Sequence, residues 1–301
     1  MAATASFAPR LVLGESPRWH AGRLWACDWE RRELVAVDAR GGRQVMATVP
    51  SAPFAVDWSA DGTLFVLAGP DLLAGGRDGL RPVADMRPLG ADGWNEIVVG
   101  AGGDAYVNSV GRDPATEPRT GTIALVATDG TVRQVADGLA SPSGMAVTPD
   151  GATLLVAESS AHRITAFDVD PAGGLGGRRV WAHLGHAVPG GLCLDADGAV
   201  WCADVPGRRC IRVREGGEVL DVVATDRGWF SCALGDEAHP TLYVVGAFWT
   251  GLSGPSRGEP TGRVLTVPAP APAPAPGVPA GPATGRDPAP DRTAHPVAAG
   301  C

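Results

Sequence analysis

The sequence predicts an all-β protein: a six-bladed β-propeller followed by a disordered Pro/Ala-rich tail. Three observations carry this prediction: the glycine and proline content, a repeat of about 44 residues, and a change of composition near residue 268. The 301 residues include 42 glycines and 27 prolines, and both residue types interrupt helices. A helical bundle is therefore disfavoured, and many short strands joined by turns remain.

One pattern recurs through the chain: an apolar run, a turn containing Gly or Asp, and a second apolar run. The turn glycines follow one another at intervals of about 40 to 48 residues, the period of a four-stranded propeller blade. The six copies begin at Glu15, Pro53, Asn95, Ser143, Gly190 and Trp229. Their uniform spacing favours a propeller over a β-sandwich or two smaller β domains.

The two ends of the repeat region are expected to close the ring, because propellers usually complete one blade with strands from both ends. The segments FAPRLVLG at residues 7–14 and GRVLTVPA at residues 262–269 are the natural pair. We expect residues 1–267 to form the propeller. Residues 268–301 alternate Pro and Ala and then become polar, so we expect an extended, disordered tail that is dispensable for folding.

Charge and composition restrict the partners. A formal net charge of −8 without a Lys/Arg cluster argues against nucleic-acid binding. No apolar stretch is long enough to span a membrane, and the first residues do not resemble a signal peptide. We therefore expect a cytoplasmic protein that acts on a small molecule and keeps its six cysteines mostly buried and reduced. The oligomeric state stays open.

A propeller gathers equivalent positions of all blades around its axis, so the starts of the inner strands are expected to ring one mouth of the central channel. Counting back from the turn glycines, these positions are Glu15, Phe54, Asn95, Ser143, Gly190 and either Trp229 or Phe230. A few polar groups among apolar walls are typical of a small-molecule site. Glu15 and Asn95 are the candidate catalytic residues. The candidate substrate-binding residues are Asn95, Phe54, Trp229 and Phe230.

Four motifs resemble the senescence-marker-protein-30/gluconolactonase/luciferin-regenerating-enzyme family. They are LGESPRW with Glu15, WNEIVV with Asn95, SPSGMAVTPDG with Ser143 and VPGGLCLDADGAVW with Gly190. The resemblance covers essentially the whole folded part, with the motifs in the family's order and spacing. It implies a six-bladed propeller that hydrolyses lactones with a divalent cation, often calcium, in the central channel.

The resemblance also implies roles for single residues. Glu15 matches a glutamate ligand of the cation, and Asn95 matches an asparagine on the substrate side. Two further ligand positions differ, because Ser143 stands where the family has Asn and Gly190 where it has Asp, which is also a candidate base. Calcium takes about six to eight oxygen ligands, carboxylates among them. We therefore expect a divalent cation to be held weakly by Glu15 and Ser143, or to be lost.

Three functions stay open at this point. The first is a lactone or related ester hydrolase with a depleted metal site. The second is a metal-independent enzyme on the same scaffold that cyclises or isomerises its substrate, with Glu15 as general base. The third is a catalytically inactive propeller that binds a small molecule.

Other polar residues have weaker claims on the site. His186 is an alternative cation ligand, although loop histidines are more often exposed. Ser159, Ser160 and His162 lack the nucleophile-elbow motif of a hydrolase triad. Glu96 is expected to point away from the channel mouth because side chains alternate along a strand. Polar residues that recur just after each second strand are expected to cap turns: Asp28, Asn108, Glu158 and Asp204.

Overall fold

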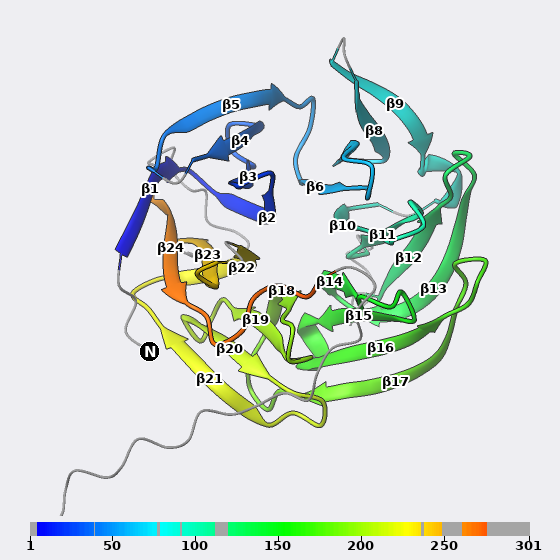
Figure 1. Ribbon diagram of the computed structural model, residues 1–301. Helices are drawn as coiled ribbons and strands as arrows, with labels where there is room; N and C mark the ends of the chain where they lie inside the picture. The colour runs from blue at the N-terminus through cyan, green and yellow to red at the C-terminus, as the bar shows by residue number, and fades with distance from the viewer. Residues whose placement is uncertain are drawn as a thin grey trace, which may run out of the picture.

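The computed structural model describes residues 5–38, 40–76, 79–90, 92–111, 120–235, 238–248 and 261–275. Within these ranges the chain forms six four-stranded antiparallel sheets arranged as blades around a central axis (Figure 1). The predicted six-bladed propeller is confirmed. The helices in the same ranges are two 3-10 turns, Arg87–Leu89 and Ser159–Ala161, and no helix described here is long and apolar enough to cross a membrane.

In each blade the first strand is innermost and the chain then moves outward (Figure 1). Blade 1 consists of β2 (Gly14–His20), β3 (Arg23–Asp28), β4 (Glu33–Val37) and β5 (Arg43–Thr48). Blade 2 consists of β6 (Phe54–Trp58), β7 (Leu64–Ala68), β8 (Asp71–Gly76) and β9 (Gly79–Asp85). Blade 3 consists of β10 (Trp94–Val99), β11 (Ala105–Ser109), β12 (Thr120–Val126) and β13 (Val132–Ala140).

The second half of the ring repeats this order. Blade 4 consists of β14 (Pro142–Val147), β15 (Thr153–Glu158), β16 (Arg163–Val169) and β17 (Leu175–His183). Blade 5 consists of β18 (Pro189–Leu194), β19 (Val200–Asp204), β20 (Arg209–Val213) and β21 (Val219–Ala224). Blade 6 consists of β22 (Gly228–Gly235), β23 (Thr241–Ala247), β24 (Gly262–Pro268) and the N-terminal strand β1 (Ala5–Leu11).

The ring closes as the sequence predicts. β1 pairs antiparallel with β24, with Ala5 opposite Thr266 and Leu11 opposite Gly262. The turns between first and second strands need a left-handed backbone, which glycine adopts without steric cost. The glycines that define the repeat have φ angles between +72° and +91°: Gly22, Gly62, Gly103, Gly151 and Gly198. This requirement explains why they recur.

The core lies between the blades. The described residues form six hydrophobic clusters, and each cluster joins residues of two neighbouring blades. Between blades 1 and 2, for example, Cys27 and Leu34 pack with Phe54 and Val66. Full burial of one such side chain stabilises the fold by about 1.5–3 kcal/mol. Every blade therefore packs against both of its neighbours.

Most of the described cysteines are buried, as the sequence predicts. The five that the structure describes carry free thiols, four of them buried. Cys193 and Cys232 bring their sulfur atoms to 3.7 Å across blades 5 and 6. The hydrogen bond with Cys232, together with burial, raises the pKa of the Cys193 thiol well above its usual range. Cys301 lies outside the described residues.

β-Bulges interrupt the starts of the inner strands. In blade 1 the register between β2 and β3 shifts between Glu15 and Arg18, and blades 3 to 6 show the same kind of shift near the start of their first strand. A bulge turns side chains away from simple alternation. The β6–β7 pair of blade 2 runs without a shift from Phe54 to Trp58. Blade 2 therefore differs from the others at the channel.

The first residues of the predicted tail lie against the propeller. The Ala269 amide donates to the Pro240 carbonyl at 2.7 Å, and the Ala196 amide donates to the Pro272 carbonyl at 2.9 Å. Ala271 is only 4% exposed. The packed part of the chain therefore continues beyond the expected end of the propeller at residue 267.

This segment, orange in Figure 1, runs from β24 toward the middle of the ring. Its residues Ala273 and Pro274 line a cavity of about 300 Å³ together with Arg18, Asp57 and other residues from the inner strands. The segment thus reaches the central channel. Residues 276–301 lie outside the described residues, so their disorder stays a prediction.

Candidate functional site

A pocket with a volume of about 620 Å³ lies where the inner strands begin. Its lining includes Glu15 from β2, Ser143 from β14, Gly190 from β18 and Phe230 from β22. These are four of the positions that the repeat predicts around one channel mouth. Segments from blades 1, 4, 5 and 6 therefore meet at one concave site.

Hydroxyl groups and an imidazole make up most of the remaining polar lining: Ser141, Ser159, Ser160 and His162. The apolar lining includes Val188, Val205 and Phe230. The pocket lining within the described ranges contains no lysine or arginine. Such a mixture suits a small neutral molecule with both hydroxyl groups and apolar surface.

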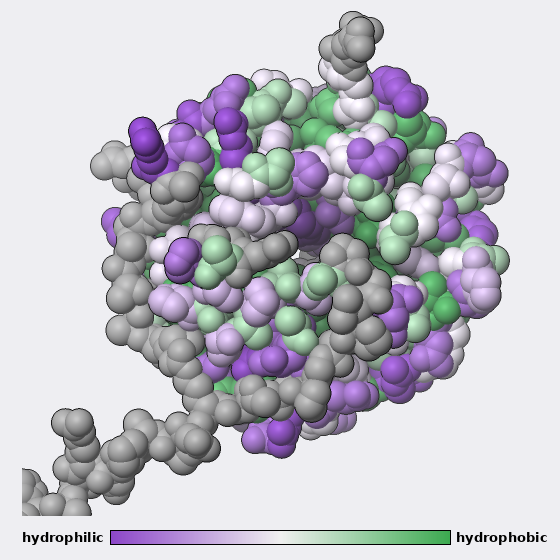
Figure 2. All heavy atoms as spheres, in the orientation of Figure 1, coloured by the Kyte–Doolittle hydropathy of each residue, from purple (hydrophilic) through white to green (hydrophobic). Residues whose placement is uncertain are grey.

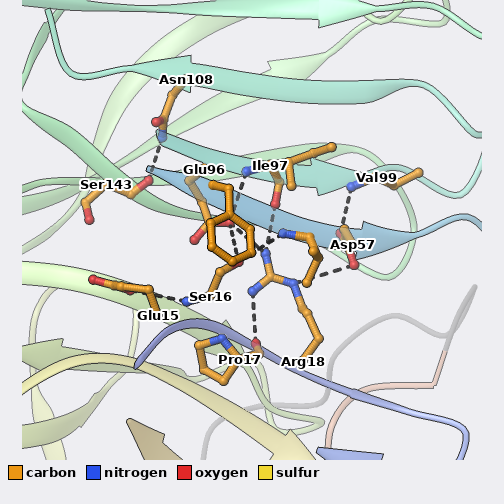
Figure 3. Close-up of polar contacts among 12 residues, drawn as sticks. Glu15, Ser16, Pro17, Arg18, Asp57, Glu96, Ile97, Val99, Asn108 and Ser143 are labelled. Carbon is orange, nitrogen blue, oxygen red and sulfur yellow. Dashed lines mark hydrogen bonds and ion pairs between the residues drawn. The ribbon is translucent and has the colours of Figure 1, made fainter. Parts of the chain in front are cut away.

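Glu15 occupies the bulge of β2. The neighbouring Ser16 has a φ angle of +44°, and its amide donates to Oε2 of Glu15 at 3.2 Å. In Figure 3 the side chains of Glu15 and Ser143 point to the same side, away from Asp57. The bulge therefore turns the Glu15 carboxyl into the pocket.

The Glu15 carboxyl has a strongly raised pKa. Burial raises its pKa from 4.5 to about 8, and the nearby charge of Glu96 adds to the increase. The Ser16 amide and the Arg18 guanidinium act in the opposite direction but do not cancel the shift. A carboxyl with this pKa exchanges a proton readily near neutral pH, as a general acid or base requires.

A network of charged side chains fills the middle of the channel, next to Glu15 (Figure 3). Nη2 of Arg18 lies 3.0 Å from Oε1 of Glu96, and its Nε lies 3.5 Å from Oδ1 of Asp57. The guanidinium also donates to the carbonyls of Ile97 at 2.8 Å and Pro17 at 3.0 Å. Figure 2 shows hydrophilic side chains gathered at the opening in the middle of the ring.

Both carboxylates of this network have further hydrogen bonds. Glu96 accepts from the Ser16 hydroxyl at 3.1 Å and from the Ile97 amide at 3.0 Å. Asp57 accepts from the Val99 amide at 2.8 Å. Burial is the main cause that raises the pKa of both carboxyls. The network joins blades 1, 2 and 3 through one guanidinium paired with two largely buried carboxylates.

Glu96 corrects the sequence expectation. It does not point away but contacts Arg18 and Ser16, with 6% of its surface exposed. The register shift between Trp94 and Glu96 breaks the alternation on which the expectation depended. Asn95 is half-buried on the same strand and is not among the described residues that line the pocket. Its contact with substrate stays a prediction.

Two expected ring residues lie in the core instead. Phe54 is 0% exposed and packs with Cys27, because blade 2 has no bulge to turn its side chain toward the channel. Trp229 is also 0% exposed, and its indole nitrogen donates to the Thr225 hydroxyl. Phe230, the alternative in the sixth blade, lines the pocket.

The serine and histidine side chains near β15 belong to the pocket, which the sequence did not predict. His162 places Nδ1 2.9 Å from the Ala187 carbonyl, and Ser159 donates to the Pro189 carbonyl at 2.6 Å. A carbonyl oxygen only accepts hydrogen bonds, so Nδ1 of His162 carries the hydrogen. In this tautomer Nε2 can accept a hydrogen bond. These bonds to backbone do not form a nucleophile–base pair, in agreement with the missing triad motif.

Four buried polar residues fix the chain that leads into the inner strands. They are Asp28, Asn108, Glu158 and Asp204, each at most 1% exposed. Glu158 accepts from the Ala140 amide at 2.7 Å, and Asp204 accepts from the Val188 amide at 3.1 Å. Beyond capping turns, they hold the segments that carry Ser143 and Gly190 to the pocket.

These residues do not fit the calcium-type site that the resemblance implies. Glu15 is the single carboxylate in the described lining, and Ser143 adds only a hydroxyl. A Cβ atom at Gly190 would lie 2.6 Å from the Phe230 carbonyl oxygen, so an acidic side chain cannot replace this glycine without backbone movement. His186 is exposed. No group of three or more His, Cys, Asp or Glu side chains within the described ranges could hold a metal ion.

The fold and the pocket define a six-bladed propeller with a concave pocket at one mouth of its central channel. Comparison with known sequences assigns the chain to a family. Residues 13–248 match the SMP-30/Gluconolactonase/LRE-like region, and the chain belongs to this family. The resemblance of the four motifs is thereby confirmed.

Named relatives cover most of the chain. Regucalcin of Gallus gallus is 25% identical over 251 residues, which are 79% of this chain and 84% of the relative. The pentonolactonase XacC of Haloferax volcanii is 26% identical over 250 residues, which are 78% of this chain and 81% of the relative. The crystal structure of regucalcin from Agrobacterium tumefaciens, described as a calcium-binding protein, superposes with a TM-score of 0.71 at 20% identity and covers 91% of this chain and 97% of that chain.

Proposed function

We propose that the chain hydrolyses a small lactone or a related ester in the pocket, with Glu15 as the group that moves the proton. The position of the Glu15 carboxyl carries the proposal: it is half-buried, lines the pocket and lies among hydroxyl groups. Its pKa of about 8 leaves both protonation states populated near neutral pH. Membership in a family with lactonase-named relatives supports hydrolysis over other reactions.

The reaction needs one proton to move twice. The ionised Glu15 carboxylate accepts a proton from a water molecule, whose oxygen bonds to the carbonyl carbon of the lactone. In the resulting tetrahedral intermediate the bond from that carbon to the ring oxygen breaks. Glu15 then returns the proton to the ring oxygen, which leaves as a hydroxyl group. The product is a hydroxy acid, and Glu15 ends as it began.

The hydroxyl groups of the pocket would bind and orient the substrate. Ser143 lines the pocket, and its position is fixed because Asn108 donates to its carbonyl at 2.5 Å. Its hydroxyl can donate to the lactone carbonyl as negative charge develops there, which stabilises the transition state. Nε2 of His162 can accept from a substrate hydroxyl. A lining without basic side chains in the described ranges favours neutral lactones over phosphorylated ones.

A panel of neutral five- and six-membered lactones tests this function. Released acid is titrated with and without a chelator, for the natural protein and for Glu15→Gln. We expect turnover of at least one lactone and a loss of kcat/KM of about 100-fold or more in Glu15→Gln, the usual range for a lost general base.

Glu218→Gln is the matched control, because this glutamate side chain is 57% exposed and pairs with Arg214, outside the described pocket. The control variant should keep the full rate. Hydrolysis that survives in Glu15→Gln would remove Glu15 from the mechanism. Substrate conversion without acid release would contradict hydrolysis and favour an isomerising or cyclising reaction with the same base.

A further inference from the structure

The middle of the channel already contains a cation, which belongs to the protein. The Arg18 guanidinium lies between Glu96 and Asp57, two carboxylates from neighbouring blades. The three side chains are 18%, 8% and 18% exposed, respectively. Since each carboxylate is close to the same guanidinium, their oxygens face one shared space. The guanidinium occupies the space that both carboxylates face.

The network is complete without a metal ion. Besides the two carboxylates, the guanidinium donates to the Pro17 and Ile97 carbonyls. A guanidinium is always charged and holds a fixed fork of donors, so it suits a buried position between two acids. A metal ion at this place would meet a fixed positive charge and two acids that are already paired.

The pocket that Glu15 lines does not offer an alternative site for a metal ion. Glu15 is the one carboxylate in its described lining, Ser143 supplies a neutral hydroxyl, and Gly190 has no space for a side chain. Calcium needs about six to eight oxygens, several of them charged. Neither the pocket lining nor the Arg18 network therefore offers the oxygen ligands that a divalent cation needs.

We propose that Arg18 is the resident cation of this channel and replaces the divalent cation that the family resemblance implies. Glu96 and Asp57, the two carboxylates that Arg18 contacts, are then open to another cation only when the guanidinium is removed. The inference goes beyond the proposed hydrolysis, because it concerns the charge balance of the channel and applies to any reaction in the pocket. Its test needs no substrate.

The test compares the natural protein with Arg18→Met and Arg18→Lys. Each protein is stripped with a chelator and titrated with calcium chloride by calorimetry, and its melting temperature is measured with millimolar calcium and with chelator. Methionine keeps much of the side-chain length but removes the charge, which leaves Glu96 and Asp57 to attract another cation. Lysine keeps the charge and is the matched control.

The natural protein and Arg18→Lys should show no calcium-dependent shift of the melting temperature. Arg18→Met should bind calcium at least about tenfold more tightly than Arg18→Lys and should be stabilised by it, because a ligand that binds the folded state raises its stability. Equal calcium affinity of the two variants would overturn the proposal. If Arg18→Met does not fold, the natural protein decides alone: one calcium ion bound with micromolar affinity overturns the proposal, and no binding supports it.

Discussion

Arg18 and Glu96 join blade 1 to blade 3 across the channel: Nη2 of Arg18 lies 3.0 Å from Oε1 of Glu96, although 78 residues separate them in the sequence. The pair fixes the electrostatic surroundings of Glu15. Glu96 raises the pKa of the Glu15 carboxyl and Arg18 lowers it, while burial is the largest cause of its increase to about 8. The candidate catalytic acid thus depends on residues of two blades.

The raised pKa of Glu15 predicts a pH-dependent stability. The carboxyl titrates near 4.5 in the unfolded chain and near 8 in the folded protein. Its contribution to stability is therefore fully present below pH 4.5 and is lost as the pH rises through 8, because the folded state resists ionisation. Glu15→Gln should remove this loss and raise the free energy of unfolding at pH 9 by up to about 5 kcal/mol, with little change at pH 4.

Urea unfolding at both pH values measures this difference, with Glu218→Gln as a control that should follow the natural protein. The groups that face Glu15, namely Glu96 and Arg18, stay in place in both variants. A free energy of unfolding with the same pH dependence in Glu15→Gln and the natural protein would contradict the raised pKa.

Gly190 predicts a steric effect. A Cβ atom there would lie 2.6 Å from the Phe230 carbonyl oxygen, across the contact between blades 5 and 6. Gly190→Ala should lower the free energy of unfolding by about 1–3 kcal/mol, the usual cost of overpacking. Gly176→Ala is the control, since a Cβ atom there meets nothing within 4 Å and its backbone is not left-handed. Thermal or urea unfolding of both variants measures the effect. Equal stability of Gly190→Ala and Gly176→Ala would contradict the predicted steric conflict with the Phe230 carbonyl.

The same steric conflict bears on any attempt to rebuild a metal site. The sequence suggests that Ser143→Asn together with Gly190→Asp would restore the family's ligands. The structure adds a cost at residue 190 that the sequence does not reveal, because the obstacle is a backbone atom of the next blade.

The tail predicts a difference between two shortened chains. A chain that ends at Ala275 keeps the bonds from Ala196 to Pro272 and from Ala269 to Pro240, and should melt within a degree or two of the full protein. A chain that ends at Pro268 loses both bonds, and its melting temperature should fall by about 3–5 °C. Differential scanning calorimetry compares the two. Equal melting temperatures would mean that the segment adds no stability.

The sequence predicts the blades well because their turns depend on local chemistry. A left-handed turn favours glycine wherever it occurs, so Gly62 or Gly103 marks its blade without knowledge of the rest of the chain. The paired ends of the ring could also be predicted, since a closed propeller needs them.

The site is predicted less completely because bulges decide where its side chains point. Counting along the strand finds Glu15 and Phe230 but also gives Phe54, which the regular strand of blade 2 directs into the core. Arg18 and Glu96 were hidden for the same reason. Their partnership depends on two bulges in separate blades, and the sequence shows neither.

The central claim is that Glu15 handles the proton in this pocket, and carbon-13 NMR of the glutamate side-chain carboxyls tests it most directly. The pKa of Glu15 is read from its chemical shift as a function of pH, without any substrate. The structure predicts a carboxyl that titrates near pH 8 in the natural protein and is missing from the spectra of Glu15→Gln. The Glu15 signal is the one that is missing from the spectra of Glu15→Gln, and its titration below about pH 6 in the natural protein would contradict the claim.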